Sequence, residues 1–242
     1  MRRGRGSAAL TVAIAVIAGV LAASACGQSP APVTAPSPPA AAGASPGAAP
    51  AGEAPAALQP GDRHRGKERS YTCLGCHGID DYKNAYPTYS VPKLEGQNPE
   101  YIAAALHGYR DGDRSHLTMH SEASTLTDQD ILDIAVHFAG KPLAATGKSA
   151  GAAPKAAALC TSCHGLDGVA VVPVYPSLAG QHEDYLLRAL EEYQKGGRKN
   201  PVMKTFAANL TDEDKATIAR YFSNLTPGLA TEPRPYSRFS AQ

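Results

Sequence analysis

Two six-residue segments with the same pattern of cysteine, histidine and glycine constrain this chain more than any other feature. The first is CLGCHG at residues 73–78, and the second is CTSCHG at residues 160–165. The 242-residue chain has only five cysteines, and these segments hold four of them. The chain also lacks tryptophan and has only 6% aromatic residues. Its core volume must therefore come partly from something other than large side chains.

The sequence around these segments is an internal duplication. The cysteines and histidines match at an offset of 87 residues, whereas PKLEGQ at 92–97 matches PSLAGQ at 176–181 at an offset of 84. The first copy thus has three extra residues, near DDYKNAYPTYS at 80–90. Matching at a fixed offset indicates repeated structural units. We predict a first repeat at residues 63–147 and a second repeat at residues 148–228.

The secondary-structure signals in both repeats are helical. Pro99 after Asn98 predicts a helix start, and so do Thr127 and Thr211, each with an aspartate three residues later. Apolar residues after these starts recur at about 3.6 residues, and no convincing alternating strand pattern is found. Short helices are also expected to carry the cysteines. We predict an all-α fold with three to five short helices in each repeat.

The N-terminal part has a different composition from the repeats. A positive start and an apolar stretch predict an export signal at residues 1–25. Small residues before Cys26 resemble a lipoprotein cleavage box, which predicts a lipid-anchored periplasmic protein; the alternative is an ordinary signal peptide with Cys26 unmodified. Residues 26–62 are rich in Pro and Ala and are expected to form a disordered tether. Residues 229–242 are expected to be a C-terminal tail.

Four interpretations of the Cys-x-x-Cys-His pattern compete. A thioredoxin-like site needs a strand–helix–strand setting, which is missing. A disulfide would close a very small loop and leave the histidine unexplained, and a zinc site would join ligands far apart in the sequence. Covalent haem uses every residue, because two thiols add to the haem vinyl groups and the next histidine binds the iron. We therefore predict two haem c groups, attached through Cys73, Cys76, Cys160 and Cys163, with His77 and His164 as iron ligands.

Two methionines beyond the initiator, Met119 and Met203, occupy matching positions downstream of these motifs. A thioether stabilises reduced iron and raises the reduction potential, so both methionines are predicted to be the sixth ligands. In the first repeat His116 and His120 flank Met119 and are alternative ligands. Neither has a matching histidine in the second repeat.

Further matching residues suggest supporting roles. The carbonyl of Pro92 or Pro176 is a candidate acceptor for the second nitrogen of the ligand histidine, with a simple turn proline as the alternative. Arg114 and Arg198 are either partners of a haem propionate or solvated charges. The Gly96-Gln97 and Gly180-Gln181 pairs are expected to pack near the haem. The unmatched histidines are interpreted as surface or structural residues; they are His107, His137 and His182.

The combination CTSCHG, YPSLAGQ, YLLRALEEYQKGGRKNPVM and LTDEDKATIARYF resembles the cytochrome c4 family of dihaem cytochromes c, and CLGCHG with PKLEGQ resembles its first half. The similarity spans about residues 65–226. The resemblance implies two class I cytochrome c folds about a pseudo-twofold axis, with inward-facing propionates. It also implies haem attachment and His/Met ligation at the residues given above. The departures lie in the first repeat, at the three-residue insertion and the histidines beside Met119.

The resemblance further implies a periplasmic electron carrier. Its partners would be redox proteins, namely a cytochrome oxidase, a bc1-type complex or a dehydrogenase, together with the membrane surface through lipid at Cys26. A formal net charge of +1 gives no nucleic-acid footprint. The alternatives are a cytochrome subunit of a larger dehydrogenase and a dihaem oxidoreductase with a non-methionine ligand in the first repeat. With both irons closed by His and Met, an enzyme is not expected.

Overall fold

The computed structural model describes residues 57–148 and 151–232. The predictions for residues 1–25, for Cys26 and for most of 26–62 lie outside the described residues. The described residues form short helices joined by long loops, and their only β-type pairings are isolated bridges. The all-α prediction is confirmed. No helix in this part of the chain has the length and apolar character needed to cross a membrane.

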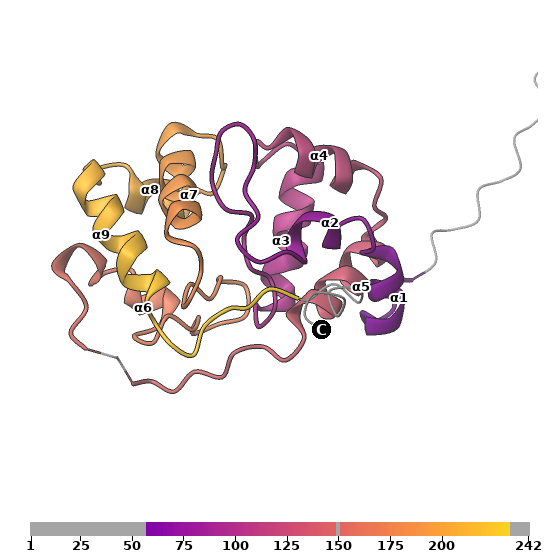
Figure 1. Cartoon of the computed structure of the whole chain (residues 1–242), viewed down its shortest axis with the longest axis horizontal. Helices are drawn as coiled ribbons and strands as arrows, with labels where there is room; N and C mark the ends of the chain where they lie inside the picture. Colours follow the sequence, from indigo (N-terminus) through magenta and orange to yellow (C-terminus); the bar gives the residue numbers. More distant parts are fainter. Residues whose placement is uncertain (1–56, 149–150, 233–242) are drawn as a thin grey trace, which may run out of the picture. The chain divides into compact units, whose positions relative to one another are not determined.

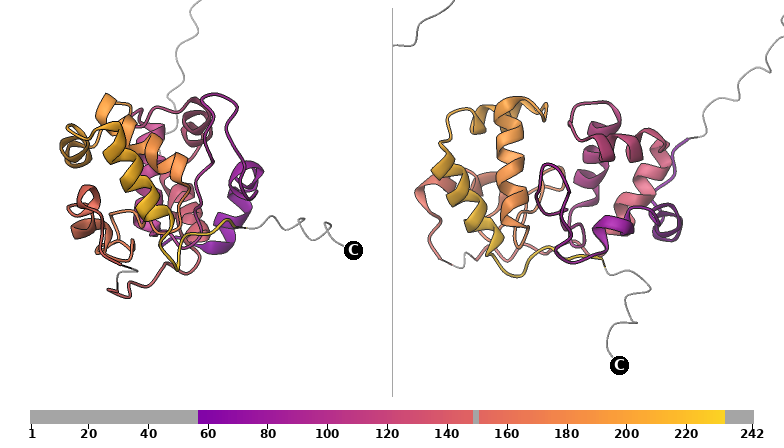
Figure 2. Two further views of the ribbon diagram at one scale, coloured as in Figure 1. Left: turned by 60° about the vertical axis from the view of Figure 1, so that its left-hand side comes forward. Right: turned by 45° about the horizontal axis from the view of Figure 1, so that its top comes forward.

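The helices follow the same order in both repeats, apart from the first one (Figures 1 and 2). The first repeat has α1 (Arg63–Arg69), α2 (Leu74–His77), α3 (Pro99–Arg110), α4 (Leu117–Ser124) and α5 (Asp128–Ala139). The second repeat has the 3₁₀ helix η1 (Lys155–Ala157), α6 (Thr161–His164), α7 (Glu183–Lys195), α8 (Pro201–Ala207) and α9 (Asp212–Ser223). The exact domain boundaries stay predictions.

The last helix of each repeat begins as predicted. Thr127 and Thr211 accept a hydrogen bond from the backbone N–H of Asp130 and Asp214, and each aspartate accepts one in return from the threonine N–H. These reciprocal bonds satisfy N–H groups that a helix start would otherwise leave unpaired. Pro99 opens α3 as expected, but the Asn98 side chain does not cap this helix.

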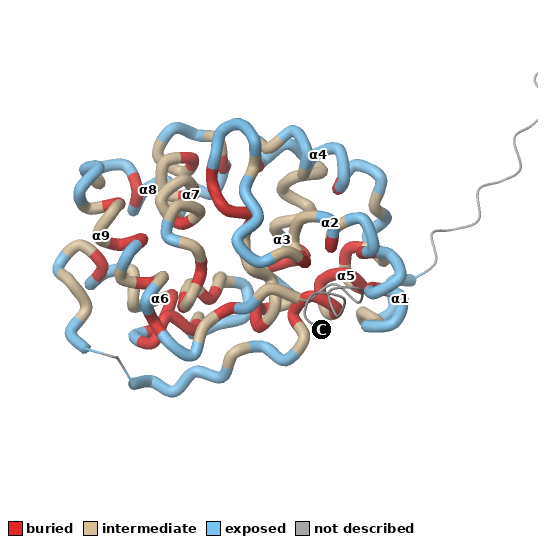
Figure 3. The backbone as a smooth tube through the Cα atoms, in the orientation of Figure 1, coloured by how far each residue is buried: buried red, intermediate tan, exposed pale blue. Residues whose placement is uncertain are grey.

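Each repeat has a small apolar core built on its last helix (Figure 3). In the first repeat Ile131, Ile134 and Phe138 of α5 are at most 2% exposed. In the second repeat Ile218 and Phe222 of α9 are at most 3% exposed. The 3.6-residue apolar pattern therefore predicted the buried faces correctly.

Two glutamine side chains join the repeats by a reciprocal set of hydrogen bonds. Gln97 accepts from the Ser177 N–H at 2.8 Å and donates to the Ser177 carbonyl at 2.9 Å. Gln181 makes the matching pair with Lys93, at 3.0 Å in both directions. The Gly-Gln pairs were expected to pack near the haem, which stays a prediction. In the structure their amides connect one repeat to the other in the same way from both sides.

A second reciprocal contact lies between the arginine segments. The Ser115 N–H donates to the Gly197 carbonyl and the Lys199 N–H donates to the Asp113 carbonyl, each at 2.7 Å. Arg114 and Arg198 therefore face each other as an antiparallel bridge. Together with the glutamine contacts, these bonds hold the matched loops of the two repeats against each other.

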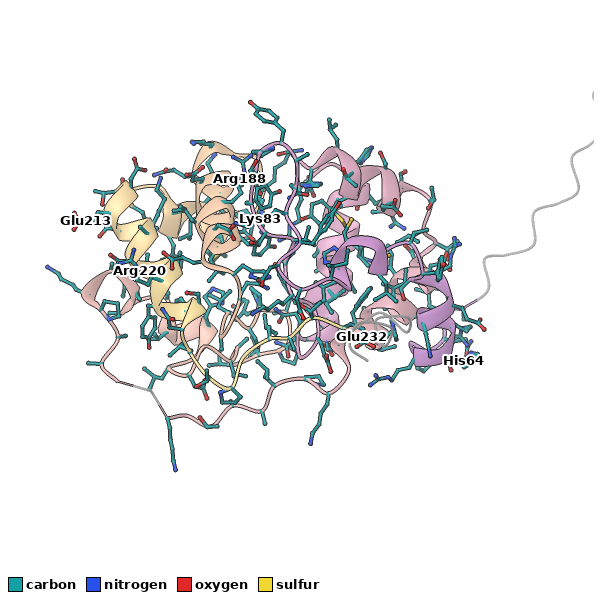
Figure 4. All side chains as sticks on the ribbon, in the orientation of Figure 1. His64, Lys83, Arg188, Glu213, Arg220 and Glu232 are labelled. Carbon is teal, nitrogen blue, oxygen red and sulfur yellow. The ribbon has the colours of Figure 1, made fainter. Side chains whose placement is uncertain are left out.

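The three-residue insertion of the first repeat also contacts the second repeat. The Ser90 N–H and hydroxyl both donate to Asp184 at the start of α7, at 3.0 Å. Lys83, labelled in Figure 4, lies 3.5 Å from the same carboxylate. Tyr89 is only 7% exposed. The insertion thus covers part of the junction, a role that its sequence did not predict.

Candidate redox site

One helical turn presents the two cysteines and the histidine of each motif. The His77 N–H donates to the Cys73 carbonyl at 2.9 Å, and the His164 N–H donates to the Cys160 carbonyl at 3.0 Å. These bonds close α2 and α6, as the sequence predicted. A turn of this kind brings side chains three and four residues apart to one face.

Both histidines are oriented by a prolyl carbonyl. Nδ1 of His77 lies 2.9 Å from the Pro92 carbonyl oxygen, and Nδ1 of His164 lies 2.9 Å from that of Pro176. A carbonyl only accepts, so Nδ1 carries the proton and Nε2 keeps its lone pair for a metal. Burial lowers the pKa of both imidazoles, although the carbonyls act in the opposite direction. Each ring is therefore held as a neutral donor.

The two methionines lie in matching short helices. Met119 is in α4 and Met203 is in α8, and both are half-buried. The helix starts also match, because His116 Nδ1 accepts from the Met119 N–H at 3.2 Å and Asn200 Oδ1 accepts from the Met203 N–H at 2.9 Å. His116 therefore does in the first repeat what Asn200 does in the second.

The other alternative ligand is also engaged elsewhere. Nδ1 of His120 lies 2.8 Å from the Tyr109 carbonyl, and the His120 side chain is exposed. His116 lies edge-on to the rings of Tyr89 and Tyr109, with centroid distances of 6.3 Å. Nδ1 of His116 accepts a backbone N–H, so in the neutral ring Nε2 carries the proton and has no lone pair for a metal. His120 is exposed whereas Met119 is half-buried, and together these observations favour the thioether of Met119 over either imidazole.

A cavity of about 490 Å³ brings the four predicted residues of the second repeat together. Cys160, Cys163, His164 and Met203 all line it, with apolar side chains around them. Thiols, an imidazole and a thioether facing one apolar cavity fit a covalently attached haem. The same succession of helices carries Cys73, Cys76, His77 and Met119 in the first repeat, and this cavity does not include them.

The competing interpretations of the cysteines lose support. All four described cysteines are free thiols, and burial raises the pKa of Cys73 and Cys160, opposite to the shift of a redox-active thiol. Within residues 57–148 and 151–232, no three His, Cys, Asp or Glu side chains are grouped as a metal site would need. This argues against zinc held by both pairs.

Arg114 and Arg198 are not solvated charges. They are 9% and 4% exposed, and both line the cavity. Each guanidinium lies over two tyrosine rings, at 5.0–5.6 Å from the ring centres. The rings belong to matching tyrosines of α3 and α7, namely Tyr101, Tyr109, Tyr185 and Tyr193.

The charge balance of the two arginines differs. Arg198 donates to the Glu192 carboxylate at 2.7 Å, whereas the position that matches Glu192 in the first repeat is Gly108. Arg114 donates to the Tyr101 hydroxyl at 2.9 Å. Glu192 also accepts from Arg188 at 2.8 Å, so this one buried carboxylate lies among more than one cation, and the cavity edge keeps an excess of positive charge that suits an anionic group. The matching tyrosines were a sequence signal for this cluster, at the same 84-residue offset.

Known proteins resemble the chain in sequence and in fold. A family model described as cytochrome c oxidase, cbb3-type, subunit III, matches residues 149–222. Cytochrome c4 of Pseudomonas aeruginosa is 33% identical over 186 residues, which are 68% of this chain and 89% of that protein. The thiosulfate dehydrogenase electron acceptor of Stutzerimonas stutzeri is 31% identical over 171 residues, which are 63% of this chain and 78% of that protein.

The fold comparison agrees. The crystal structure of reduced recombinant cytochrome c4 from Pseudomonas stutzeri has a TM-score of 0.54 and 28% identity, covering 68% of this chain and 99% of that one. Tandem all-α repeats, each with a Cys-x-x-Cys-His turn and a downstream methionine helix, define an electron-transferring c-type cytochrome with covalently bound haem. Within this class, the chain belongs to the cytochrome c4 family.

Proposed function

We propose that this cytochrome carries two haem c groups and passes single electrons between redox proteins in the periplasm. Cys73 and Cys76 would attach one haem, with His77 and Met119 as its iron ligands. Cys160 and Cys163 would attach the other, with His164 and Met203. The observation that carries the proposal is the cavity lined by all four residues of the second set.

The chemistry that bound haem would supply is reversible one-electron transfer at iron. The protein's part is to hold Nδ1–H of each histidine on a prolyl carbonyl and to keep water out with apolar side chains. Arg114 and Arg198 would hold the haem carboxylates, since both line the cavity, and Arg114 donates to the Tyr101 hydroxyl where Arg198 has the Glu192 carboxylate. Buried positive charge in a haem site would favour the reduced state and raise the potential.

The proposed location rests on the N-terminal sequence. Residues 1–25 have the pattern of an export signal, and the small residues before Cys26 have the pattern of a lipidation site. Haem attachment to Cys-x-x-Cys-His outside the cytoplasm is in keeping with this. We propose a periplasmic protein held at a membrane by lipid on Cys26, with residues 26–62 as its tether.

The proposed partners are a cytochrome oxidase, a bc1-type complex or a dehydrogenase. One relative is named an electron acceptor of thiosulfate dehydrogenase, which favours a dehydrogenase as the second candidate partner. A role as a subunit of such a complex would require a partner that stays bound during purification, whereas a shuttle would not.

The test is a visible and near-infrared spectrum of the oxidised holoprotein, with its covalent haem content. We expect two haems per chain that remain with the denatured polypeptide in acidified organic solvent. We also expect two equivalents of the weak near-infrared band of sulfur-ligated ferric iron. One equivalent would contradict Met119 or Met203 as a ligand, and fewer than two covalent haems would contradict the proposal itself.

A further inference from the structure

The rim of the second-repeat cavity is apolar where the matching positions of the first repeat are polar. Three rim residues, Leu159, Val202 and Phe206, line the cavity and are 72%, 55% and 47% exposed. The residues at the matching positions of the first repeat are Thr72, Thr118 and Glu122. The two ends of the molecule thus differ at three positions that occupy the same places in the repeat.

The first repeat shows that these positions face outward. The Thr72 hydroxyl donates to the Glu122 carboxylate at 3.2 Å, and both side chains are exposed. A carboxylate packed against the apolar body of a cofactor would pay a large desolvation cost, so Glu122 must face water. Because the first repeat manages with a carboxylate here, Phe206 at the matching position is not needed to enclose haem. Its apolar surface is free for another use.

The charges beside the rim also differ. Lys155 precedes Leu159 by one turn, and Lys204 lies between Val202 and Phe206 in α8; both lysines are exposed. The matching residues of the first repeat are Glu68 and His120. The rim of the second repeat therefore has two exposed lysines where the first repeat has Glu68, which lies among the basic residues of α1, and His120.

Other charges also lie near the cavity, and most of them are paired: Asp111 lines it and lies 3.4 Å from Arg110. Lys199 also lines the cavity, but it lies 3.4 Å from Asp113 of the first repeat and is balanced by it. The starts of α5 and α9 are acidic in both repeats, with Glu213 as an additional carboxylate in the second. What remains in the second repeat is an apolar centre bordered by the exposed Lys155 and Lys204.

We propose that this rim (Lys155, Leu159, Val202, Lys204 and Phe206) is the docking face for an acidic redox protein. The inference rests on the proposed haem of the second repeat. An apolar centre with a charged border is the usual composition of a protein interface, and complementary charge speeds association. At the first repeat the same partner would meet the Glu122 carboxylate in place of the apolar Phe206. One electron then leaves the reduced partner and is gained at the second repeat, with no bond made or broken.

Flavodoxin, an acidic one-electron carrier, is the probe for the test. Its hydroquinone form is mixed with the oxidised holoprotein in a stopped-flow instrument at low and high ionic strength. For the double variant Lys155→Gln/Lys204→Gln we expect the second-order rate to fall about five- to tenfold at low ionic strength, and the difference to vanish at high salt. The matched variant Glu68→Gln/Glu122→Gln should change the rate less than twofold. An unchanged rate in the lysine variant, or an equal change in both variants, would overturn the proposal.

The apolar centre is tested separately at high ionic strength. Leu159→Thr/Phe206→Gln should slow reduction about threefold, and Thr72→Leu/Glu122→Gln should leave the rate unchanged. Calorimetric titration with oxidised flavodoxin should give a Kd that weakens in parallel with the rate. Haem content and the near-infrared band are measured first in every variant.

Fewer than two haems, or a missing near-infrared band, would contradict the proposed function. Two intact haems with reduction rates that the rim substitutions do not change would contradict only the docking face.

Discussion

The two repeats orient their histidines in the same way, but different elements pack on the last helix of each repeat. Both imidazoles meet a prolyl carbonyl at 2.9 Å. In the first repeat α1 packs on α5 and is fixed by Asp133, whereas the second repeat has only η1 in that place and Thr217 at the position of Asp133. The contact between histidine and prolyl carbonyl is therefore the feature that both sites share. The element that packs on the last helix, α1 or η1, differs between the repeats.

The largest expected effect comes from removing the thiols of one repeat at a time. In Cys160→Ala/Cys163→Ala, the second repeat loses its covalent haem and with it most of its core, since an 80-residue unit with few aromatics is marginal alone. Mass spectrometry should find one haem per chain, and circular dichroism should show lost helix. Cys73→Ala/Cys76→Ala should leave more helix, because α1 packs on α5 through the buried Gly66 and the Arg65–Asp133 ion pair. Equal losses would contradict this difference between the repeats.

Asp133 is expected to matter next most. Its carboxylate accepts from Arg65 Nε at 2.7 Å and from the Asp62 N–H at 2.7 Å, and it is 3% exposed. Asp133→Asn should lower the free energy of unfolding by about 1–3 kcal/mol. Denaturant titration of the holoprotein measures this. The substitution Thr217→Val, at the matching position, serves as the control and should change stability far less.

The same carboxylate predicts a pH dependence. The hydrogen bond from Arg65 is the main cause that lowers the pKa of Asp133 below its ordinary value of 3.8. The stabilisation of the fold by the Asp133 carboxylate is therefore complete above about pH 4. It is lost as the pH falls through the lower pKa that Asp133 has in the folded state. Asp133→Asn should remove this part of the acid destabilisation. If the free energy of unfolding of the wild type and of Asp133→Asn fell equally with pH below pH 4, the prediction would be contradicted.

The reciprocal glutamines test the symmetry of the junction. Gln97→Ala and Gln181→Ala each remove two hydrogen bonds between the repeats and leave buried backbone groups unpaired. We expect each substitution to lower the free energy of unfolding by about 1–3 kcal/mol, with the two losses nearly equal. Calorimetry should show two unfolding transitions separating in the double variant. Strongly unequal effects would mean that the junction is not symmetric in energy.

The smallest expected effect is at His137 of α5. It is 5% exposed and its Nε2 has no hydrogen-bond partner. Burial is the main cause that lowers its pKa, so His137 destabilises the fold as the pH falls below about 6.5. His137→Phe should raise the free energy of unfolding by about 1 kcal/mol. It should also make that free energy depend less on pH between pH 5 and 7, which denaturant titrations at several pH values would measure. Tyr221, at the matching position, donates to the Leu166 carbonyl, so Tyr221→Phe should instead be neutral or destabilising.

The sequence by itself determined the parts of this protein that depend on short segments. The helix starts at Thr127 and Thr211, the buried faces of α5 and α9 and the turns that carry the cysteines follow from neighbours within a few residues. The duplication identified Met119 and Met203 as a pair. Such features are readable because capping and helical periodicity act locally.

Only the tertiary structure decided what the matched residues contact across the repeats. Gln97 meets Ser177, Asp184 meets the insertion at Ser90, and Arg114 is buried rather than solvated. These partners are some 80 to 94 residues apart in sequence. Their pairing arises because two half-buried surfaces pack together and each polar group so buried must find a partner. That choice depends on how the repeats pack, which no single stretch of sequence encodes.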